Sequence, residues 1–215
     1  MSLILHNYFR SSTSIRVRIA LAMKGIDYRY ASYALLNNEH KSEDFLKLNP
    51  QGLVPSLETP EGVISQSMAI LEYLDEVHPE PALLPSAPMD RARVRSLAQI
   101  VAMDIHPVNN LRVLQYLRSE FNADDAAVKQ WFQHWACEGF EALEARLSGE
   151  QETGRYCHGD SPTLADICLV SQAINNKRFG IETEPYPTIA RIVRSCLELP
   201  AFVAGLPDQQ PDAAG

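Results

Sequence analysis

The sequence lacks any long apolar run and any excess of positive charge. No stretch approaches the about 20 apolar residues that a membrane-spanning helix requires, so we expect no membrane partner. A signal peptide is not expected either, because His6, Asn7 and Arg10 interrupt the apolar N-terminal residues. The net charge is −8, whereas nucleic-acid-binding proteins usually carry a basic surface. We therefore expect no nucleic-acid partner.

Cysteine is scarce, and its spacing matches no known site. No Cys-x-x-Cys motif occurs, and the four cysteines show no metal-ligand spacing with the six histidines. We expect reduced, mostly buried thiols in a cytoplasmic protein, with no bound metal. Any reactive thiol that the function requires must then come from another molecule.

The predicted elements divide the chain into two domains. Residues 1–84 predict the order β-α-β-α-β-β-α, with strands at 3–5, 28–33, 55–58 and 63–65 and helices at 15–24, 42–48 and 67–77. A proline-rich stretch at 79–90 indicates a linker, which we place at 85–90. The remaining residues, 91–215, predict helices at 91–121, 126–147, 163–176 and 188–196. We expect residues 206–215 to be poorly ordered.

Four consecutive hydroxyl residues, Ser11, Ser12, Thr13 and Ser14, stand between Arg10 and the first predicted helix. A helix start carries unpaired backbone N–H groups and a partial positive charge, so it favours an anion such as a thiolate or a carboxylate. One hydroxyl suffices for an N-cap. Four of them beside an arginine indicate a binding site. The two further arginines of this helix, Arg16 and Arg18, are expected at the surface or at an interface.

A second group of polar residues lies later in the first domain. Pro55 opens a predicted strand, and a cis Val54–Pro55 bond would expose the Val54 backbone to an added peptide strand. Spacing alone leaves cis and trans open. Gln66 and Ser67 open the last helix of the domain, where a carboxylate is favoured. Together these features suit an extended peptide that carries a thiolate and a carboxylate.

Three stretches resemble the zeta class of cytosolic glutathione transferases. They are Ser-Ser-Thr-Ser-Ile-Arg-Val-Arg-Ile-Ala-Leu at 11–21, Asn-Pro-Gln-Gly-Leu-Val-Pro at 49–55 and Gln-Ser-Met-Ala-Ile at 66–70. The resemblance extends over nearly the whole chain. It implies a thioredoxin-like α/β N-terminal domain, an all-α C-terminal domain, a homodimer and glutathione as the cofactor.

The resemblance also implies a glutathione site. Ser12 and Thr13 would lie near the sulfur, Val54 would pair with the cysteinyl backbone beside a cis Pro55, and Gln66 and Ser67 would hold the γ-glutamyl carboxylate. His40 would reach the glycyl end, and Asp104 of the partner subunit would approach the γ-glutamyl amine. Many members of the class have a cysteine at the position of Thr13, but a hydroxyl can also donate to a thiolate.

The class includes glutathione-dependent cis–trans isomerases. The resemblance implies an isomerase for maleylacetoacetate, an intermediate of tyrosine breakdown, with maleylpyruvate of gentisate breakdown as the alternative substrate. Both reactions need a thiolate at neutral pH and positive charge for substrate carboxylates. Arginine suits this role because its planar fork binds two oxygens. Arg10 beside the hydroxyl run is the first candidate, and Arg112 and Arg178 are the others.

One stretch of the helix predicted at 91–121 is unusual. Pro107 is expected to kink the helix, and Asp104, His106, Asn109 and Arg112 are expected to share one face near the kink. We expect His106 to touch glutathione or the substrate.

Two other functions remain open at this level. A glutathione-conjugating transferase for small haloacids would have a more apolar second cleft with few arginines. A non-catalytic binding protein on the same scaffold would have lost the thiolate site, and the hydroxyls of Ser12, Thr13 and Ser67 argue against that loss.

Overall fold

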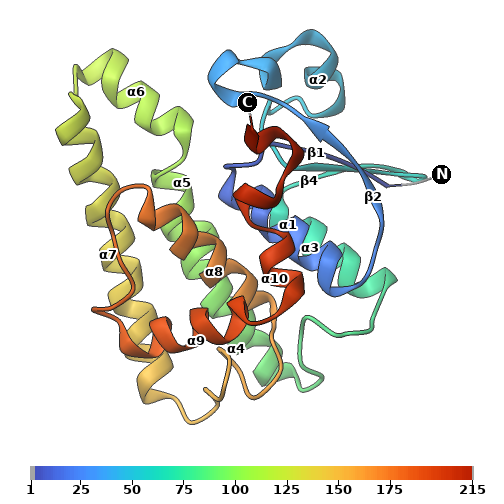
Figure 1. Cartoon of the computed structure of the whole chain (residues 1–215), viewed down its shortest axis with the longest axis vertical. Coiled ribbons are helices and arrows are strands. Elements are labelled where there is room, and N and C mark those ends of the chain that lie inside the picture. The colour runs from blue at the N-terminus through green and yellow to red at the C-terminus, as the bar shows by residue number, and fades with distance from the viewer. Residues whose placement is uncertain (1–2, 215) are drawn as a thin grey trace. The chain divides into compact units, whose positions relative to one another are not determined.

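The computed structural model describes residues 3–214, which form two compact units (Figure 1). The first unit comprises the chain up to Leu83 together with the C-terminal segment from Leu197, and the second comprises Leu84–Cys196. The C-terminal segment differs from expectation, because it belongs to the first unit and was expected in the helical domain.

The first unit is built on a four-stranded sheet in the order β2-β1-β3-β4. β1 pairs in parallel with β2 and antiparallel with β3, and β3 pairs antiparallel with β4. The strands are β1 (Leu3–Asn7), β2 (Tyr28–Ser32), β3 (Ser56–Thr59) and β4 (Gly62–Ser65). The long helices are α1 (Ser12–Met23) and α3 (Ser67–Val77), and the short ones are η1 (Leu35–Asn37), η2 (Glu39–Lys41) and α2 (Glu43–Leu48). This is the predicted β-α-β-α-β-β-α order of a thioredoxin-like domain.

Helix α1 lies at the centre of this unit. It packs against α3 and also against α10 (Pro200–Ala204) from the C-terminal segment. Because both sides are covered, every residue from Ser14 to Leu21 is buried, including Arg16 and Arg18 at 1% exposure each. The expectation that these two arginines lie at the surface or at an interface was wrong. The apolar stripe of α1 indicates one packing partner, but the helix packs against two, α3 and α10.

The second unit is helical. Its elements are α4 (Pro88–Gln99), the π-helical η3 (Ile100–Ile105), α5 (His106–Val108), α6 (Leu111–Phe121), α7 (Asp125–Gly149), α8 (Leu164–Lys177) and α9 (Pro187–Leu197). The single helix expected over residues 91–121 is therefore interrupted. A π-helical segment precedes Pro107, and the chain turns at Asn109 and Asn110 before α6 begins. The side chain of Asn110 caps α6 by accepting the Arg112 amide hydrogen.

The N-terminus of α8 is closed by a capping box. Thr163 Oγ1 accepts the Ala165 amide, and Asp166 accepts both the backbone and the side-chain hydrogens of Thr163. Asp166 also accepts the Cys157 amide at 2.8 Å and is fully buried. Burial raises the pKa of Asp166, whereas these donors act to lower it. The cap therefore joins α8 to the loop that contains Cys157.

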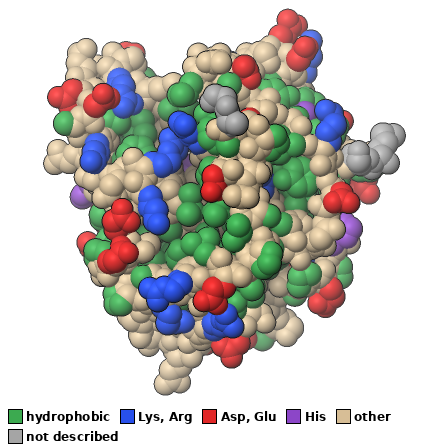
Figure 2. All heavy atoms as spheres, in the orientation of Figure 1, with side chains coloured by type: hydrophobic (Ala, Val, Ile, Leu, Met, Phe, Trp, Pro, Cys, Tyr) green, Lys and Arg blue, Asp and Glu red, His purple; other side chains and the backbone are tan. Residues whose placement is uncertain are grey.

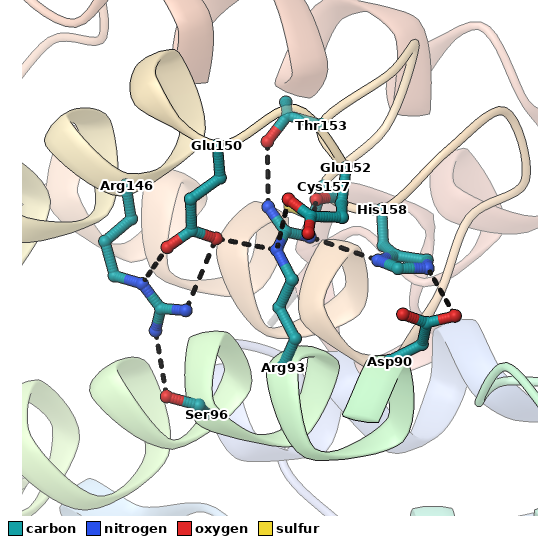
Figure 3. A network of polar contacts seen from close by, with 9 residues as sticks. All are labelled: Asp90, Arg93, Ser96, Arg146, Glu150, Glu152, Thr153, Cys157 and His158. Atoms are coloured by element: carbon teal, nitrogen blue, oxygen red, sulfur yellow. Dashed lines mark hydrogen bonds and ion pairs between the residues drawn. The ribbon is translucent and has the colours of Figure 1, made fainter. Parts of the chain in front are cut away.

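A network of charged side chains joins α4 to the end of α7 (Figure 3). Arg93 donates to Glu150 at 2.6 Å, to the Cys157 carbonyl at 2.8 Å and to Thr153 at 2.9 Å. Arg146 donates to the other oxygen of Glu150 at 2.7 Å. Hydrogen bonds from Arg146 and Arg93 lower the pKa of Glu150, whereas burial acts to raise it. The network stabilises the second unit.

The C-terminal segment is folded. After α10 it forms the 3₁₀ turns η4 (Pro207–Gln209) and η5 (Pro211–Ala214). The expectation of poor order from residue 206 was therefore wrong for the residues described; Gly215 lies outside them. Side-chain hydrogen bonds of Gln210 and Asp212 hold this segment in place, and composition gives no sign of such bonds.

Two further observations concern possible partners. Within residues 3–214, no helix is both long and apolar enough to cross a bilayer. On the face drawn in Figure 2, Lys and Arg side chains lie among Asp and Glu side chains, without a broad field of positive charge. That face has no basic footprint for nucleic acid.

Candidate functional site

The hydroxyl run forms the start of α1. Ser11 is the N-cap, and its side chain accepts the Ser14 amide hydrogen at 3.2 Å. Thr13 Oγ1 lies 2.9 Å from Ser11 Oγ and donates to the Val54 carbonyl at 3.2 Å. Because Thr13 has a single hydroxyl hydrogen, the Ser11 hydroxyl must donate to Thr13. Ser12, 5% exposed, occupies the first helical position. Thr13 therefore connects the helix start to Val54, and Ser12 stands next to it in the first turn.

The Val54–Pro55 peptide bond is cis, as the resemblance implied. Pro55 directly precedes β3, which lies between β1 and β4, so the missing N–H removes no hydrogen bond from that strand. The loop before it is held by Asn49, whose side chain donates to the Leu53 carbonyl at 2.8 Å. This loop presents Val54 beside the start of α1.

His40 lies in η2, next to the same loop. Lys41 donates to the carbonyls of Gln51 and Gly52. Gly52 has φ +58°, and a Cβ there would lie 3.1 Å from the His40 carbonyl oxygen, so glycine allows the close approach. His40 is 8% exposed, and its Nδ1 has no hydrogen-bond partner among residues 3–214. Burial, with a smaller effect of Lys41, lowers the pKa of His40. A buried polar atom without a partner is unusual and suits a ligand contact.

The start of α3 is strained and positively charged. Gln66, the N-cap residue, has φ +71°, which is rare for a residue other than glycine and frequent at functional sites. Its side chain donates to Gln51 at 2.9 Å. Arg16 donates from within the unit to Ser67 Oγ at 3.3 Å. A buried guanidinium thus reinforces the partial positive charge of this helix start.

These contacts bring most of the predicted glutathione-binding residues of the first unit together. Thr13 joins the start of α1 to Val54, Arg16 joins α1 to the start of α3, and Gln66 joins α3 to the loop at Gln51. Arg16 was missed as a site residue. The sequence contains one sign of this position, because Arg16 is a charged residue in a helix that has no polar face. That sign can be interpreted only once α3 and α10 are known to cover the helix.

Arg10 lies in the turn between β1 and α1. The turn is closed by a hydrogen bond from the Ser11 amide to the Tyr8 carbonyl at 3.0 Å. Arg10 is exposed, and its guanidinium carbon lies 4.8 Å from the centre of the Phe9 ring. The cation is held against an aromatic face, two residues before Ser12.

In the second unit, two loops are joined to one turn of α7. Trp131 donates to the Val108 carbonyl, and Asn109 donates to the Phe132 carbonyl at 3.1 Å. On the other side, Gln133 donates to the Phe179 carbonyl at 2.8 Å, and the Phe132 and Phe179 rings stack with centres 3.6 Å apart. The loop before Arg112 and the residue after Arg178 therefore meet the same turn.

Four predicted residues of this unit differ in their surroundings. Asp104, Arg112 and Arg178 are exposed, whereas His106 is half-buried with Nε2 3.3 Å from Asn110 Nδ2. Asn109 is buried and the helix is interrupted between Asp104 and Arg112, so the expectation that these residues share one helix face was wrong. Arg112 stands in the first turn of α6, where a cation is disfavoured by the helix dipole.

The chain has clear relatives among known proteins. A family model described as "Glutathione S-transferase, N-terminal domain" matches residues 1–76. A "Maleylpyruvate isomerase" of Ralstonia sp is 49% identical over 210 residues, which are 98% of this chain and 99% of the relative.

Solved structures agree with this result. A holo structure of a maleylpyruvate isomerase, described as a bacterial zeta-class glutathione transferase, matches with a TM-score of 0.95 at 49% identity, over 97% of this chain and 99% of the other. A maleylacetoacetate isomerase of Methylobacterium extorquens, solved with bound malonate and glutathione, matches with a TM-score of 0.94 at 41% identity, over 97% and 98% of the two chains.

Proposed function

We propose that this chain, which belongs to the glutathione S-transferase family and to its zeta class, is a glutathione-dependent cis–trans isomerase of maleylacetoacetate. One observation carries the proposal. Two helix starts rich in hydroxyl groups and a cis-proline loop are hydrogen-bonded to one another, in a chain whose relatives are named as isomerases of maleyl substrates.

The residues of the first unit suit a tripeptide that carries two carboxylates and a thiol. Ser67 and Gln66, above the buried Arg16, would hold the γ-glutamyl carboxylate at the start of α3. The unpartnered Nδ1 of His40 suits the glycyl end. Val54, fixed by Thr13, would pair with the cysteinyl backbone. Asp104 of the partner subunit of a homodimer would meet the γ-glutamyl amine.

The chemistry of the reaction requires little covalent work from the protein. Bound glutathione supplies a thiolate that adds to the cis double bond, allows rotation and leaves again to give the trans product. The Ser12 hydroxyl, the N–H groups of the first turn of α1 and the helix dipole stabilise negative charge at the sulfur. Thr13 acts through Val54, because its hydroxyl hydrogen is already donated to that carbonyl.

The arginines bind and orient the substrate. Arg10 lies two residues before Ser12, so a carboxylate bound by its planar fork would stay close to the reacting carbons. Arg112 and Arg178 would bind a second carboxylate or the oxygen that gains charge as the thiolate adds. His106, hydrogen-bonded to Asn110, would contact glutathione or the substrate. Together these cations favour dicarboxylates over uncharged electrophiles or small haloacids.

Maleylpyruvate is the second candidate substrate. The specific observation in its favour is the 49% identity to the Ralstonia maleylpyruvate isomerase, whereas the maleylacetoacetate isomerases of Pseudomonas aeruginosa and Methylobacterium extorquens are 45% and 41% identical. The two substrates differ by one methylene group, which a binding site discriminates by only about 1–3 kcal/mol. We place the enzyme, as a homodimer, in the cytoplasm, in agreement with its four cysteines, which form no disulfide within residues 3–214.

A direct assay tests the proposal. Each maleyl substrate is mixed with the purified chain, with and without glutathione, and the ultraviolet absorbance change of isomerisation is recorded. We expect turnover only when glutathione is present, with a higher kcat/KM for maleylacetoacetate. A higher kcat/KM for maleylpyruvate would support the second candidate, and no glutathione-dependent turnover of either substrate would refute the proposed reaction.

A further inference from the structure

The residues after α10 form a strap, defined here as residues 205–213, that lies along α1 (Figure 1). Gly205 begins the strap, and a Cβ there would lie 2.5 Å from Cγ1 of Ile19 and 3.1 Å from its backbone nitrogen, so glycine permits this close approach. Gln210 is buried and donates to the carbonyls of Ala204 and Leu206, both at 2.8 Å. These contacts give the strap one defined shape.

The strap ends in a carboxylate that meets the turn before α1. Asp212 accepts three hydrogen bonds. They come from the Tyr30 hydroxyl at 2.5 Å, the Ser32 hydroxyl at 2.7 Å and the backbone amide of Phe9 at 3.2 Å. Tyr30 and Ser32 lie on β2, whereas Phe9 belongs to the turn that contains Arg10. The contact with Phe9 joins residues 203 positions apart in the sequence.

Arg18 holds the same turn from the other side. It donates to the carbonyls of Tyr8 and Phe9, at 3.3 and 2.9 Å, and to the carbonyl of Gly205 at 3.1 Å. Burial lowers the pKa of Arg18, and Asp212 is among the groups that oppose this shift. The peptide groups of Phe9 are thus fixed between a buried cation, which also donates to the strap at Gly205, and the carboxylate of the strap.

We infer that Asp212 is a positioning residue, which acts through Phe9 to hold Arg10 at the start of the site. The Phe9 ring supports the Arg10 guanidinium at 4.8 Å, so movement of the Phe9 backbone moves the surface on which Arg10 lies. A charge-assisted hydrogen bond to a backbone amide gives a firm orientation. This inference rests on the proposed role of Arg10 in binding the substrate carboxylate.

Kinetics of two variants in two backgrounds test the inference. Asp212→Asn keeps the shape of the side chain and removes its charge. Asp208→Asn is the matched control, because Asp208 is an exposed carboxylate of the same strap. We expect Asp212→Asn to raise the KM for the maleyl substrate about fivefold, which corresponds to one hydrogen bond, with the KM for glutathione unchanged. In an Arg10→Ala background the same substitution should change KM less than about twofold.

Several results would overturn the inference. The same fold-change in both backgrounds would show that Asp212 acts independently of Arg10, and an unchanged KM would show that it does not act at all. If Asp212→Asn does not fold, Ser32→Ala removes one donor to the same carboxylate oxygen and should raise KM in the same direction by a smaller factor. An unchanged KM in that case would count against the inference.

A second readout separates this inference from the proposed function. Hydrogen exchange of the peptide that spans residues 8–14 should be faster in Asp212→Asn than in Asp208→Asn, whether or not the chain isomerises a maleyl substrate. If the unaltered chain has no isomerase activity, the proposed function fails and the exchange result still tests the strap. Equal exchange in both variants, or faster exchange without any change in KM in an active enzyme, would overturn the positioning role.

Discussion

Replacing Thr13 by valine tests how the start of α1 supports the glutathione site. Valine has nearly the shape of threonine, so the packing of the first turn is kept, but the hydroxyl that donates to the Val54 carbonyl at 3.2 Å is lost. A hydrogen bond of this kind contributes about 1 kcal/mol net. Val54 is half-buried, so water can replace part of the lost contact. We therefore expect the substitution to weaken glutathione binding about fivefold.

Isothermal titration calorimetry with glutathione measures this effect directly. Thr13→Ser is the matched control, because it keeps the hydroxyl and removes only a methyl group, and it should bind within about twofold of the unaltered chain. Equal dissociation constants for Thr13→Val and Thr13→Ser would refute the reasoning, since the bond to Val54 would then have no effect on binding.

Three further predictions concern the substrate, the packing and the pH dependence. Arg10→Ala should raise the KM for the maleyl substrate at least about tenfold, because a charge-assisted contact is worth about 1.5–3 kcal/mol, and unchanged kinetics would remove Arg10 from the site. Gly139→Ala should lower the free energy of unfolding in urea by about 1–3 kcal/mol, because a Cβ there would clash with the side chain of Ile105. Adding Ile105→Ala should change stability by less than the sum of the two single effects, and strict additivity would contradict this explanation. Glu150→Gln should cost about 2 kcal/mol at neutral pH, because Arg93 and Arg146 lose their shared carboxylate. Since the pKa of Glu150 is lowered in the folded state, this cost should shrink as the pH falls below its ordinary value of 4.5, and a difference in unfolding free energy that stays constant with pH would count against it.

The order of elements in residues 1–84 was predictable from local features of the sequence. Two examples are the strands expected at 55–58 and 63–65, which are present as β3 and β4, and the hydroxyl run, which forms a capped helix start with Ser11 as the cap. Each of these depends on neighbouring residues only. The roles of Ser12, His40 and the arginines in binding and catalysis remain predictions.

Features that depend on distant residues were not predictable. Whether Arg16 and Arg18 are buried depends on α10, which follows them by about 180 positions, and helical periodicity carries no information about such a contact. The same holds for Asp212. Its Pro- and Asp-rich surroundings are typical of a disordered end, and only the folded chain brings Tyr30, Ser32 and the Phe9 amide to its carboxylate.

The interruption before α6 was indicated by the sequence only in part. Pro107 indicated a distortion, but the chain leaves the helix at Asn109, whose side chain donates to the Phe132 carbonyl in α7. Asn110 then starts the next helix. The position of the break was therefore set by a partner in another helix.

The central claim is that glutathione acts as a reversible nucleophile and is not consumed. Counting free thiol during turnover of the maleyl substrate tests this claim most directly. We predict that many equivalents of trans product form per equivalent of glutathione while the free thiol concentration stays constant. A loss of one thiol for each substrate molecule converted would contradict the account and identify a conjugating transferase instead.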